Sequence, residues 1–279
     1  MSFTFHSRIG LGTWQMGENS RSESHEIAAI EAAIGMGYRL IDTAEMYASG
    51  HVETLIGKAL KRVGASTREA LQIVSKVLPS HASTKGTIAA CEASIQRMGC
   101  EYIDCYLLHW QGSYPYESTL EGMIALQERG LIRSYGISNF DAPDVRDWLA
   151  AEQRVGTPYQ TVCNQVYYAL NARGIEYDLI PLLQEKGISL MAYSPLGAGE
   201  LMRNPQLIAI AKEVNLTPAQ LALAWIMRVP NAVAIPKTVN HTRLEENLAA
   251  EDLVLETWIL AKLDRVFLPP AQKTPLHII

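Results

Sequence analysis

Four polar residues in the first part of the chain have the types needed to hand a proton to a carbonyl oxygen. Asp42, Lys76 and His109 each end a short apolar run, and Tyr47 follows Asp42 in the adjoining segment. A free tyrosine has a pKa of about 10, which is too high for efficient acid catalysis near neutrality, and a nearby ammonium lowers it. We expect Lys76 to supply that charge, Asp42 to hold Lys76 in place, and His109 to orient the carbonyl through a ring N–H.

Each of the four residues also has a structural interpretation. An isolated Asp or Lys at the end of a strand is more often a cap or a solvated charge, and an isolated His is more often a satisfied core residue. Three apolar strands that end in ionisable groups on one side must, however, neutralise those charges against each other. An ion pair between Asp42 and Lys76 is the simplest neutralisation.

Eight short runs rich in β-branched and aromatic residues are the candidate strands that position these groups. They are spaced mostly by roughly 30 residues, the size of one βα unit. Two of them, over residues 103–110 and 161–168, are apolar on both faces for much of their length, as buried parallel strands should be. The eight runs begin near Arg8, Arg39, Leu71, Tyr102, Ile132, Thr161, Ser189 and Ala232.

Helical periodicity fills the gaps between these runs. Ile27, Ile30 and Ile34 fall at i, i+3 and i+7 and predict one apolar stripe that faces a sheet. Thr217, followed by proline and then by Gln220, predicts a capped helix start. Eight alternating units favour a closed (β/α)8 barrel, the TIM-barrel fold, as one domain over residues 1–279. In such a barrel the active site lies where the strands end.

The competing fold is a doubly wound sheet that binds a dinucleotide at a G-x-G-x-x-G turn. Gly10 and Gly12 make G-x-G, but the third glycine position is Gln15, and no complete βαβ unit surrounds the pattern. A close approach between a barrel strand and its neighbour explains Gly10 better.

The composition argues against several other classes of protein. A formal net charge of -5 is unlike the clustered basic charge of a nucleic-acid-binding protein. The N-terminus lacks the features of a secretory signal, and no apolar run reaches the ~20 residues of a membrane-spanning helix. We therefore expect a cytoplasmic protein that binds neither nucleic acid nor membrane. The four cysteines form no C-x-x-C pair and H-x-H is absent, so we expect no metal site.

Three segments resemble the signatures of the aldo-keto reductases, and the resemblance runs through nearly the whole chain. They are Gly37-Tyr-Arg-Leu-Ile-Asp42-Thr-Ala-Glu-Met-Tyr47, Met98-Gly-Cys-Glu-Tyr-Ile-Asp-Cys-Tyr-Leu-Leu-His109-Trp110 and Ile235-Pro-Lys237-Thr238. The resemblance implies that Asp42, Tyr47, Lys76 and His109 form a catalytic tetrad. Short-chain dehydrogenases also pair Tyr with Lys, as Y-x-x-x-K, but none of the twelve tyrosines has Lys four residues on.

The resemblance also implies NADPH as the cofactor. Residues near 138, 139 and 165 are similar to those that hydrogen-bond the nicotinamide carboxamide, and Tyr193 is similar to the residue that stacks on its ring, although a buried strand aromatic is the alternative. The implied cofactor contacts are Thr13, Trp14, Asp42, Ser138, Asn139, Gln165, Tyr193, Ser194, Leu196, Gly197, Lys237, Thr238, Arg243, Glu246 and Asn247.

Charge favours NADP over NAD. Lys237, Thr238 and Arg243 cluster at the last strand end and the following helix start, where a 2′-phosphate could take charge-assisted hydrogen bonds. The alternative is a solvated helix surface on which Arg243 pairs with Glu246 at i,i+3.

The resemblance implies substrate contacts at Trp14, Tyr47, His109 and Trp110. The family's usual proline after His-Trp is replaced by Gln111. Three segments are brief: the loop that follows Gln111, the loop at residues 198–205, and the tail after residue 267. We expect an open site that reduces small aldehydes and 2-oxoaldehydes such as methylglyoxal, and some ketones, in a monomeric protein with broad specificity. The alternative is a regulatory or sensor protein that binds NADPH on the same barrel with negligible turnover.

Overall fold

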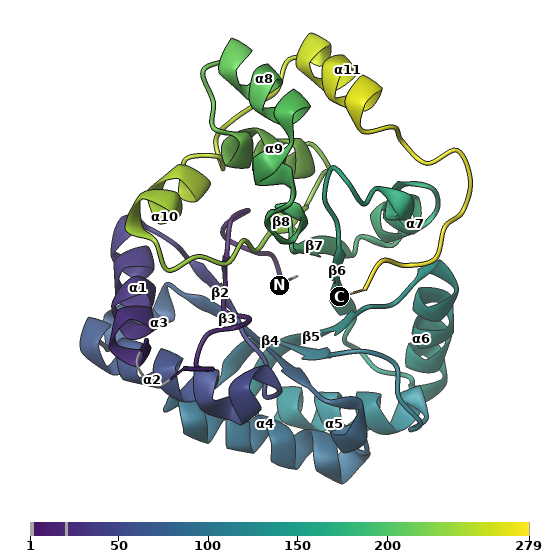
Figure 1. Cartoon of the computed structure of the whole chain (residues 1–279). Coiled ribbons are helices and arrows are strands. Elements are labelled where there is room, and N and C mark those ends of the chain that lie inside the picture. Colours follow the sequence, from purple (N-terminus) through teal and green to yellow (C-terminus); the bar gives the residue numbers. More distant parts are fainter. Residues whose placement is uncertain (1–2, 20–21, 279) are drawn as a thin grey trace.

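Eight parallel strands form one sheet whose spatial order follows the chain from β1 to β8 (Figure 1). The computed structural model describes residues 3–19 and 22–278. Every predicted run contains or leads into a strand. The strands are β1 (Leu11–Gly12), β2 (Leu40–Asp42), β3 (Gln72–Val77), β4 (Ile103–Leu108), β5 (Ile132–Ser138), β6 (Thr161–Tyr167), β7 (Ser189–Tyr193) and β8 (Val233–Ala234).

Backbone hydrogen bonds between the first and last strand segments close the sheet into a barrel. The Gly10 amide donates to the Ala234 carbonyl at 2.9 Å, and the Ala234 amide donates to the Arg8 carbonyl at 2.9 Å. A Cβ at Gly10 would lie 2.9 Å from the Leu40 side chain, so this glycine marks the predicted close approach between strand and neighbour. The predicted (β/α)8 barrel is confirmed.

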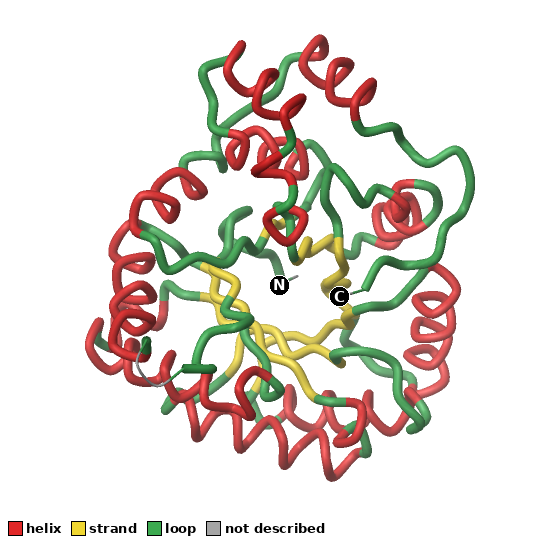
Figure 2. The backbone as a smooth tube through the Cα atoms, viewed as in Figure 1, coloured by secondary structure: helices red, strands yellow, loops and turns green. Residues whose placement is uncertain are grey.

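Helices surround the barrel, and Figure 2 shows them as a ring around the strands. The predicted start at Thr217 is confirmed: its hydroxyl accepts from the Gln220 amide at 3.2 Å, and the Gln220 side chain accepts from the Thr217 amide at 3.0 Å. The ring contains α1 (Glu23–Met36), α2 (His51–Val63), α3 (Ala65–Glu69), α4 (Thr84–Met98), α5 (Tyr116–Glu128), α6 (Ala142–Val155), α7 (Leu179–Lys186), α9 (Pro218–Met227) and α10 (His241–Leu248).

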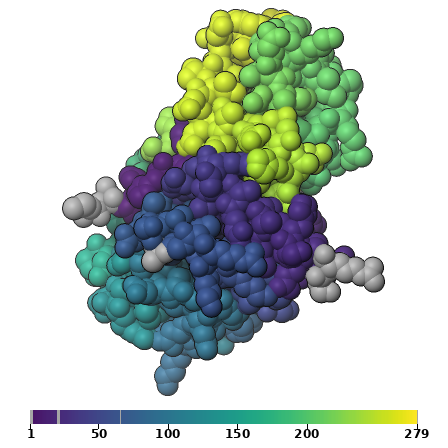
Figure 3. Space-filling model, turned by 90° about the vertical axis from the view of Figure 1, so that its left-hand side faces the viewer, coloured from purple at the N-terminus to yellow at the C-terminus, as the bar shows by residue number. Residues whose placement is uncertain are grey.

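Two further helices, α8 (Pro205–Glu213) and α11 (Thr257–Val266), form a lobe beyond one side of the barrel. Figure 3 shows this green and yellow lobe projecting from the rest of the molecule. After α11 the chain runs back toward the strands in Figure 1, and Ile278 lines a cavity at the end of the barrel. The last residues therefore return to the end of the barrel where strands β4 to β7 end.

Side chains fill the barrel interior and leave the catalytic candidates at one end. The sequence predicts that β4 and β6 are apolar on both faces, and β4 is buried along its whole length while β6 is buried at every residue except Val162. The interior cluster is Leu40, Val74, Cys105, Leu107, Cys163, Met191, Val233 and Ile235.

None of the described helices is both long and apolar enough to cross a membrane. Within residues 3–19 and 22–278, no group of three or more His, Cys, Asp or Glu side chains is placed to hold a metal ion.

Candidate active site

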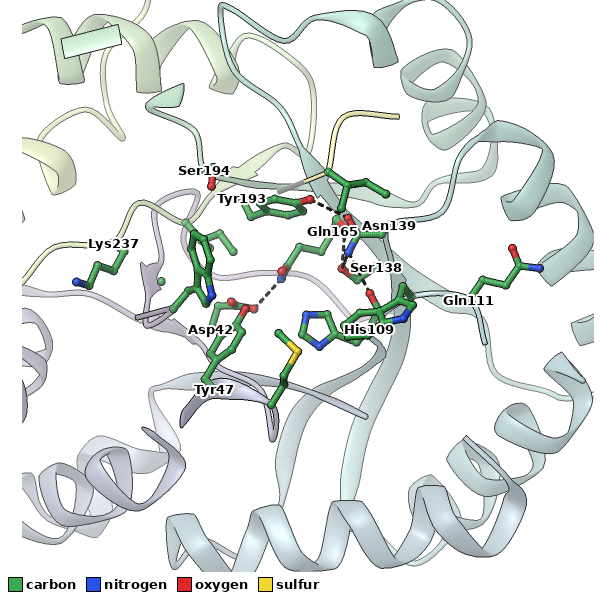
Figure 4. Close-up of a pocket in the computed structure, with 16 residues that line it drawn as sticks. Asp42, Tyr47, His109, Gln111, Ser138, Asn139, Gln165, Tyr193, Ser194 and Lys237 are labelled. Atoms are coloured by element: carbon green, nitrogen blue, oxygen red, sulfur yellow. Dashed lines mark hydrogen bonds between the residues drawn. The ribbon is translucent and has the colours of Figure 1, made fainter. Parts of the chain in front are cut away.

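A cavity of about 550 Å³ opens at the carboxyl ends of the strands, and most of the predicted site residues line it (Figure 4). The barrel brings these residues together because each of them lies at or just beyond the end of a strand. The lining residues are Gly12, Trp14, Asp42, Met46, Tyr47, His109, Trp110, Gln111, Ser138, Asn139, Gln165, Tyr193, Ser194, Ile235, Lys237 and Ile278.

A fully buried ammonium stands at the base of this site. Lys76 Nζ lies 2.9 Å from both carboxylate oxygens of Asp42, 2.8 Å from the Thr43 carbonyl oxygen and 3.2 Å from the Tyr47 hydroxyl. These three partners match the three protons of an ammonium. The Asp42–Lys76 pair predicted from charge neutralisation is therefore present, and the pair contacts Tyr47.

Asp42 is held from two further directions. The Gln165 side-chain amide donates to Asp42 Oδ1 at 2.6 Å, and the Thr13 hydroxyl donates to the Asp42 carbonyl oxygen at 2.8 Å. Thr13 is completely buried and supports the end of β2 from below the cavity rather than lining it.

The prediction that the Tyr47 pKa is lowered overall is wrong. Burial raises this pKa, and the Lys76 ammonium offsets that effect only in part. The hydroxyl is enclosed, with the whole residue 9% exposed, and in a low-dielectric site the neutral phenol is favoured over the phenolate. Burial lowers the pKa of Lys76, but the charge of Asp42, with the hydrogen bonds to Asp42 and Tyr47, outweighs burial and the pKa is raised overall. Tyr47 is thus a protonated phenol beside the charged ammonium of Lys76.

His109 stands next to Tyr47, with ring centroids 6.0 Å apart. Burial, helped by the charge of Lys76, lowers the pKa of His109 to about 2, so the ring is neutral near pH 7. Its Nδ1 is buried and has no hydrogen-bond partner among the described residues. A neutral imidazole carries one N–H and can donate a hydrogen bond to an oxygen in the cavity.

An amide cluster and an aromatic ring form the opposite wall. Asn139 Nδ2 donates to the Ser138 hydroxyl at 3.2 Å and to the His109 carbonyl oxygen at 3.1 Å. The Tyr193 hydroxyl donates to Asn139 Oδ1 at 2.8 Å, which fixes the ring on the cavity wall. Asn139 adopts a left-handed backbone with φ 60°, a conformation that asparagine tolerates better than most residues.

The chain around Tyr47 is held in an unfavourable conformation. Ala48 and Ser49 have φ of 46° and 54°, and Gly50 follows at 84°. A non-glycine residue in this region costs about 1–3 kcal/mol and persists only where its surroundings enforce it. The turn between Tyr47 and α2 therefore depends on packing around it.

Of the two cations predicted to bind a phosphate, only Lys237 lines the cavity. Lys237 is exposed, and Arg243, which does not line the cavity, is exposed in the first turn of α10. Neither side chain forms an ion pair with a described residue, so the alternative pairing of Arg243 with Glu246 is not present. The remaining predicted cofactor contacts, Leu196, Gly197, Thr238, Glu246 and Asn247, lie beyond the lining of this cavity, and Asn247 is buried.

The C-terminal tail adds a wall that the sequence does not predict. Lys273 pairs with Asp141 and with Asp178, the His277 ring lies 4.2 Å from the ring of Tyr167, and Ile278 lines the cavity. Together with Trp14, Trp110 and Met46, Ile278 gives the mouth an apolar rim. The expectation of an open site did not include this wall, because the tail is brief and yet reaches the cavity. The tail sequence has no periodicity that would predict this contact.

Three comparisons with known proteins agree with this arrangement. Residues 8–267 match the aldo/keto reductase family. Methylglyoxal reductase YeaE of Escherichia coli (strain K12) is 40% identical over 277 residues, which are 97% of this chain and 94% of that protein. Glyoxal reductase of Bacillus subtilis (strain 168) is 33% identical, and the match covers 92% of this chain and 87% of that protein.

The fold is also similar to solved structures. The crystal structure of an aldo-keto reductase from Klebsiella pneumoniae in complex with NADPH is 42% identical and matches with a TM-score of 0.90, over 98% of this chain and 95% of that one. The sequence signatures, the barrel fold and these matches lead to one conclusion. The chain belongs to the aldo/keto reductase family.

Proposed function

We propose that this protein reduces small aldehydes, 2-oxoaldehydes such as methylglyoxal and small ketones to alcohols, with Tyr47 as the proton donor. As an aldo/keto reductase it is an oxidoreductase that acts on carbonyl groups and uses NADP(H). The observation that carries the role of Tyr47 is its hydroxyl on the cavity wall, 3.2 Å from a buried ammonium. We also propose that it works as a monomer in the cytoplasm.

The cavity has the features that a nicotinamide cofactor requires. The Tyr193 ring forms a flat wall beside Ser138, Asn139 and Gln165, which offer hydroxyl and amide groups to a carboxamide. Unpaired exposed cations at Lys237 and Arg243 suit a phosphate, because the described residues leave both charges without a counterion.

Further contacts are proposed from family membership. Ser194, Leu196 and Gly197 would follow the pyrophosphate, Thr238 would join the phosphate site, and Glu246 and Asn247 would approach the adenine. Trp14 would contact the cofactor and the substrate from the rim of the cavity, and Thr13 would support the strand end beneath it. Ser194 and Gly197 have left-handed backbones, with φ of 47° and 61°, which turn the chain sharply after β7. When bound, NADPH supplies a hydride to the carbonyl carbon.

The chain's own residues account for the proton. Burial keeps Tyr47 protonated at neutral pH, and a substrate oxygen in the cavity accepts its proton. The Lys76 ammonium stabilises the phenolate left behind, and Asp42 keeps Lys76 charged and in place. The neutral His109 ring donates a hydrogen bond that orients the carbonyl oxygen.

The rim supports small substrates. Trp14, Trp110, Met46 and Ile278 surround the mouth with apolar surface, which discriminates weakly between similar small carbonyl compounds. The relatives from E. coli and B. subtilis are named for methylglyoxal and glyoxal, both small dicarbonyls. The tail residue Ile278 adds an apolar wall to the mouth of the cavity.

Tyr47→Phe tests the proton donor. We expect the variant to lose NADPH consumption with methylglyoxal by about 10²–10⁴-fold, because the phenyl ring keeps the packing but has no proton to give. NADPH binding, followed by fluorescence titration, should stay unchanged. Tyr114→Phe, at an exposed tyrosine, is the control and should keep full activity. If wild type binds NADPH but reduces nothing in a broad aldehyde and ketone panel, the regulatory alternative holds instead.

Lys237→Ala and Arg243→Ala test the phosphate site. Each removes a charge-assisted contact, which is worth about 1.5–3 kcal/mol, so the Kd for NADPH should rise at least roughly tenfold. The Kd for NADH should not change, because NADH has no 2′-phosphate. Lys212→Ala, at an exposed lysine on α8, should affect neither cofactor. Equal weakening of NADPH and NADH binding would count against this assignment.

His109→Gln tests the neutral buried imidazole. Since the folded pKa is about 2 and the unfolded value is about 6.5, only the unfolded chain gains a proton as the pH falls below about 6.5. The His109 contribution to stability is thus complete above that pH and declines toward acid. Between pH 7 and 5, wild type should lose about 2 kcal/mol more unfolding free energy than His109→Gln, measured by urea denaturation. His241→Gln, at an exposed histidine, should follow wild type, and a His109→Gln curve parallel to wild type would contradict a neutral ring.

A further inference from the structure

A buried carboxylate connects the segment that carries Tyr47 to the strand that carries Lys76. Glu53 lies in the first turn of α2, is completely buried, and accepts a hydrogen bond from the Ser75 hydroxyl at 2.6 Å. Ser75 is the neighbour of Lys76 in β3, and successive side chains of a strand point to opposite faces. Ser75 therefore faces the surrounding helices while Lys76 faces the barrel interior.

An arginine from a third element completes the connection. Arg97, near the end of α4, donates from Nε to Glu53 Oε2 at 2.7 Å, and its terminal nitrogen also donates to the Ser94 hydroxyl at 3.0 Å. The carboxylate of Glu53 thus receives one bond from β3 and an ion pair from α4. These partners hold the buried carboxylate of Glu53 in one position, between Ser75 and Arg97.

The same arginine packs against the turn that follows Tyr47. A Cβ at Gly50 would lie 2.7 Å from Arg97 Nε and 2.9 Å from its Cδ. Gly50 ends the left-handed run through Ala48 and Ser49 and directly precedes α2. The guanidinium therefore occupies the space beside the turn and is bonded to the helix that the turn leads into.

We infer that the Arg97–Glu53 pair, with Ser75, is a clamp that holds the left-handed turn after Tyr47 and so sets the distance between the Tyr47 hydroxyl and the Lys76 ammonium. The inference rests on the proposed role of Tyr47. The clamp acts on both sides of that contact: Glu53 ties α2 to β3 beside Lys76, and Arg97 supports the turn that leads back to Tyr47. Arg97 and Glu53 are positioning residues, because neither lines the cavity.

A clamp differs from an ordinary buried ion pair in what its loss changes. A misplacement of a reacting group by about 1 Å can lower a rate by about 10²-fold. The cofactor contacts and the substrate contacts other than Tyr47 lie elsewhere in the cavity and stay in place. Loss of the clamp should therefore lower kcat and leave binding nearly unchanged. Loss of an ion pair that is only structural should lower the unfolding temperature and nothing else.

A matched control lies beside the beginning of β3 and joins α3 to β4. Arg68 pairs with Asp104 at 3.0 Å, both side chains are largely buried, and Asp104 also accepts a hydrogen bond from the Ile73 amide at 2.9 Å. This pair holds the beginning of β3, whereas the Arg97–Glu53 pair lies beside its end. Arg68→Met thus breaks a comparable ion pair that contacts the same strand, away from Lys76.

The experiment compares Arg97→Met, Glu53→Gln, their double variant and Arg68→Met in NADPH-dependent methylglyoxal reduction. We expect Arg97→Met and Glu53→Gln each to lower kcat roughly tenfold or more, with KM and the Kd for NADPH within about threefold of wild type. The double variant should be no slower than the slower single variant, because both changes break one connection. Arg97→Lys, which keeps the charge without the planar guanidinium, should recover part of kcat.

Hydrogen–deuterium exchange provides a readout that does not need turnover. Arg97→Met should speed exchange in the peptide covering residues 44–52, and Arg68→Met should leave that peptide as in wild type. The clamp is overturned if Arg97→Met lowers the unfolding temperature as Arg68→Met does but changes neither kcat nor exchange in this peptide. A wild-type protein that reduces no carbonyl compound would overturn the proposed function, and the exchange of this peptide would still decide the clamp.

Discussion

The candidate active site depends on keeping one ammonium charged in a place that water does not reach. Lys76 is completely buried, and a buried charge is tolerated only when partners replace its hydration. Asp42, the Thr43 carbonyl and the Tyr47 hydroxyl supply those partners. The same contacts that make the charge tolerable also place it beside the phenol, so stability and reactivity come from one arrangement.

The need to surround a buried ammonium with fixed partners explains why a barrel suits the proposed proton transfer. Asp42 and Lys76 come from adjacent parallel strands, and His109 follows the next strand, so hydrogen bonding of the sheet sets their spacing. Tyr47 is the exception, because it stands in a turn with a left-handed backbone. A residue on such a turn needs support from outside, which the buried contacts of Glu53 and Arg97 provide. Rigid strands hold the charge, and a supported turn brings Tyr47, the proposed proton donor, to it.

Much of this could be predicted from the sequence because the signals are local. Each strand is a short apolar run, and the charged residues that end these runs identify the reactive end of the barrel. The balance of burial against charge at Tyr47 could not be predicted, since it depends on how completely the folded chain encloses the hydroxyl. The pairing of Glu53 with Arg97 joins positions 44 residues apart, and the approach of Ile278 to the cavity joins the chain end to its middle. One sequence carries no local pattern for either contact.

The central claim is that the buried Asp42–Lys76 pair makes Tyr47 an effective proton donor. The most direct test is kcat for methylglyoxal reduction by the double variant Asp42→Asn/Lys76→Met, which removes both charges together and leaves neither one buried without a partner. The account predicts a loss of at least about 10²-fold in a variant that still unfolds cooperatively. A kcat within a few-fold of wild type would show that Tyr47 does not depend on the pair and would contradict the account.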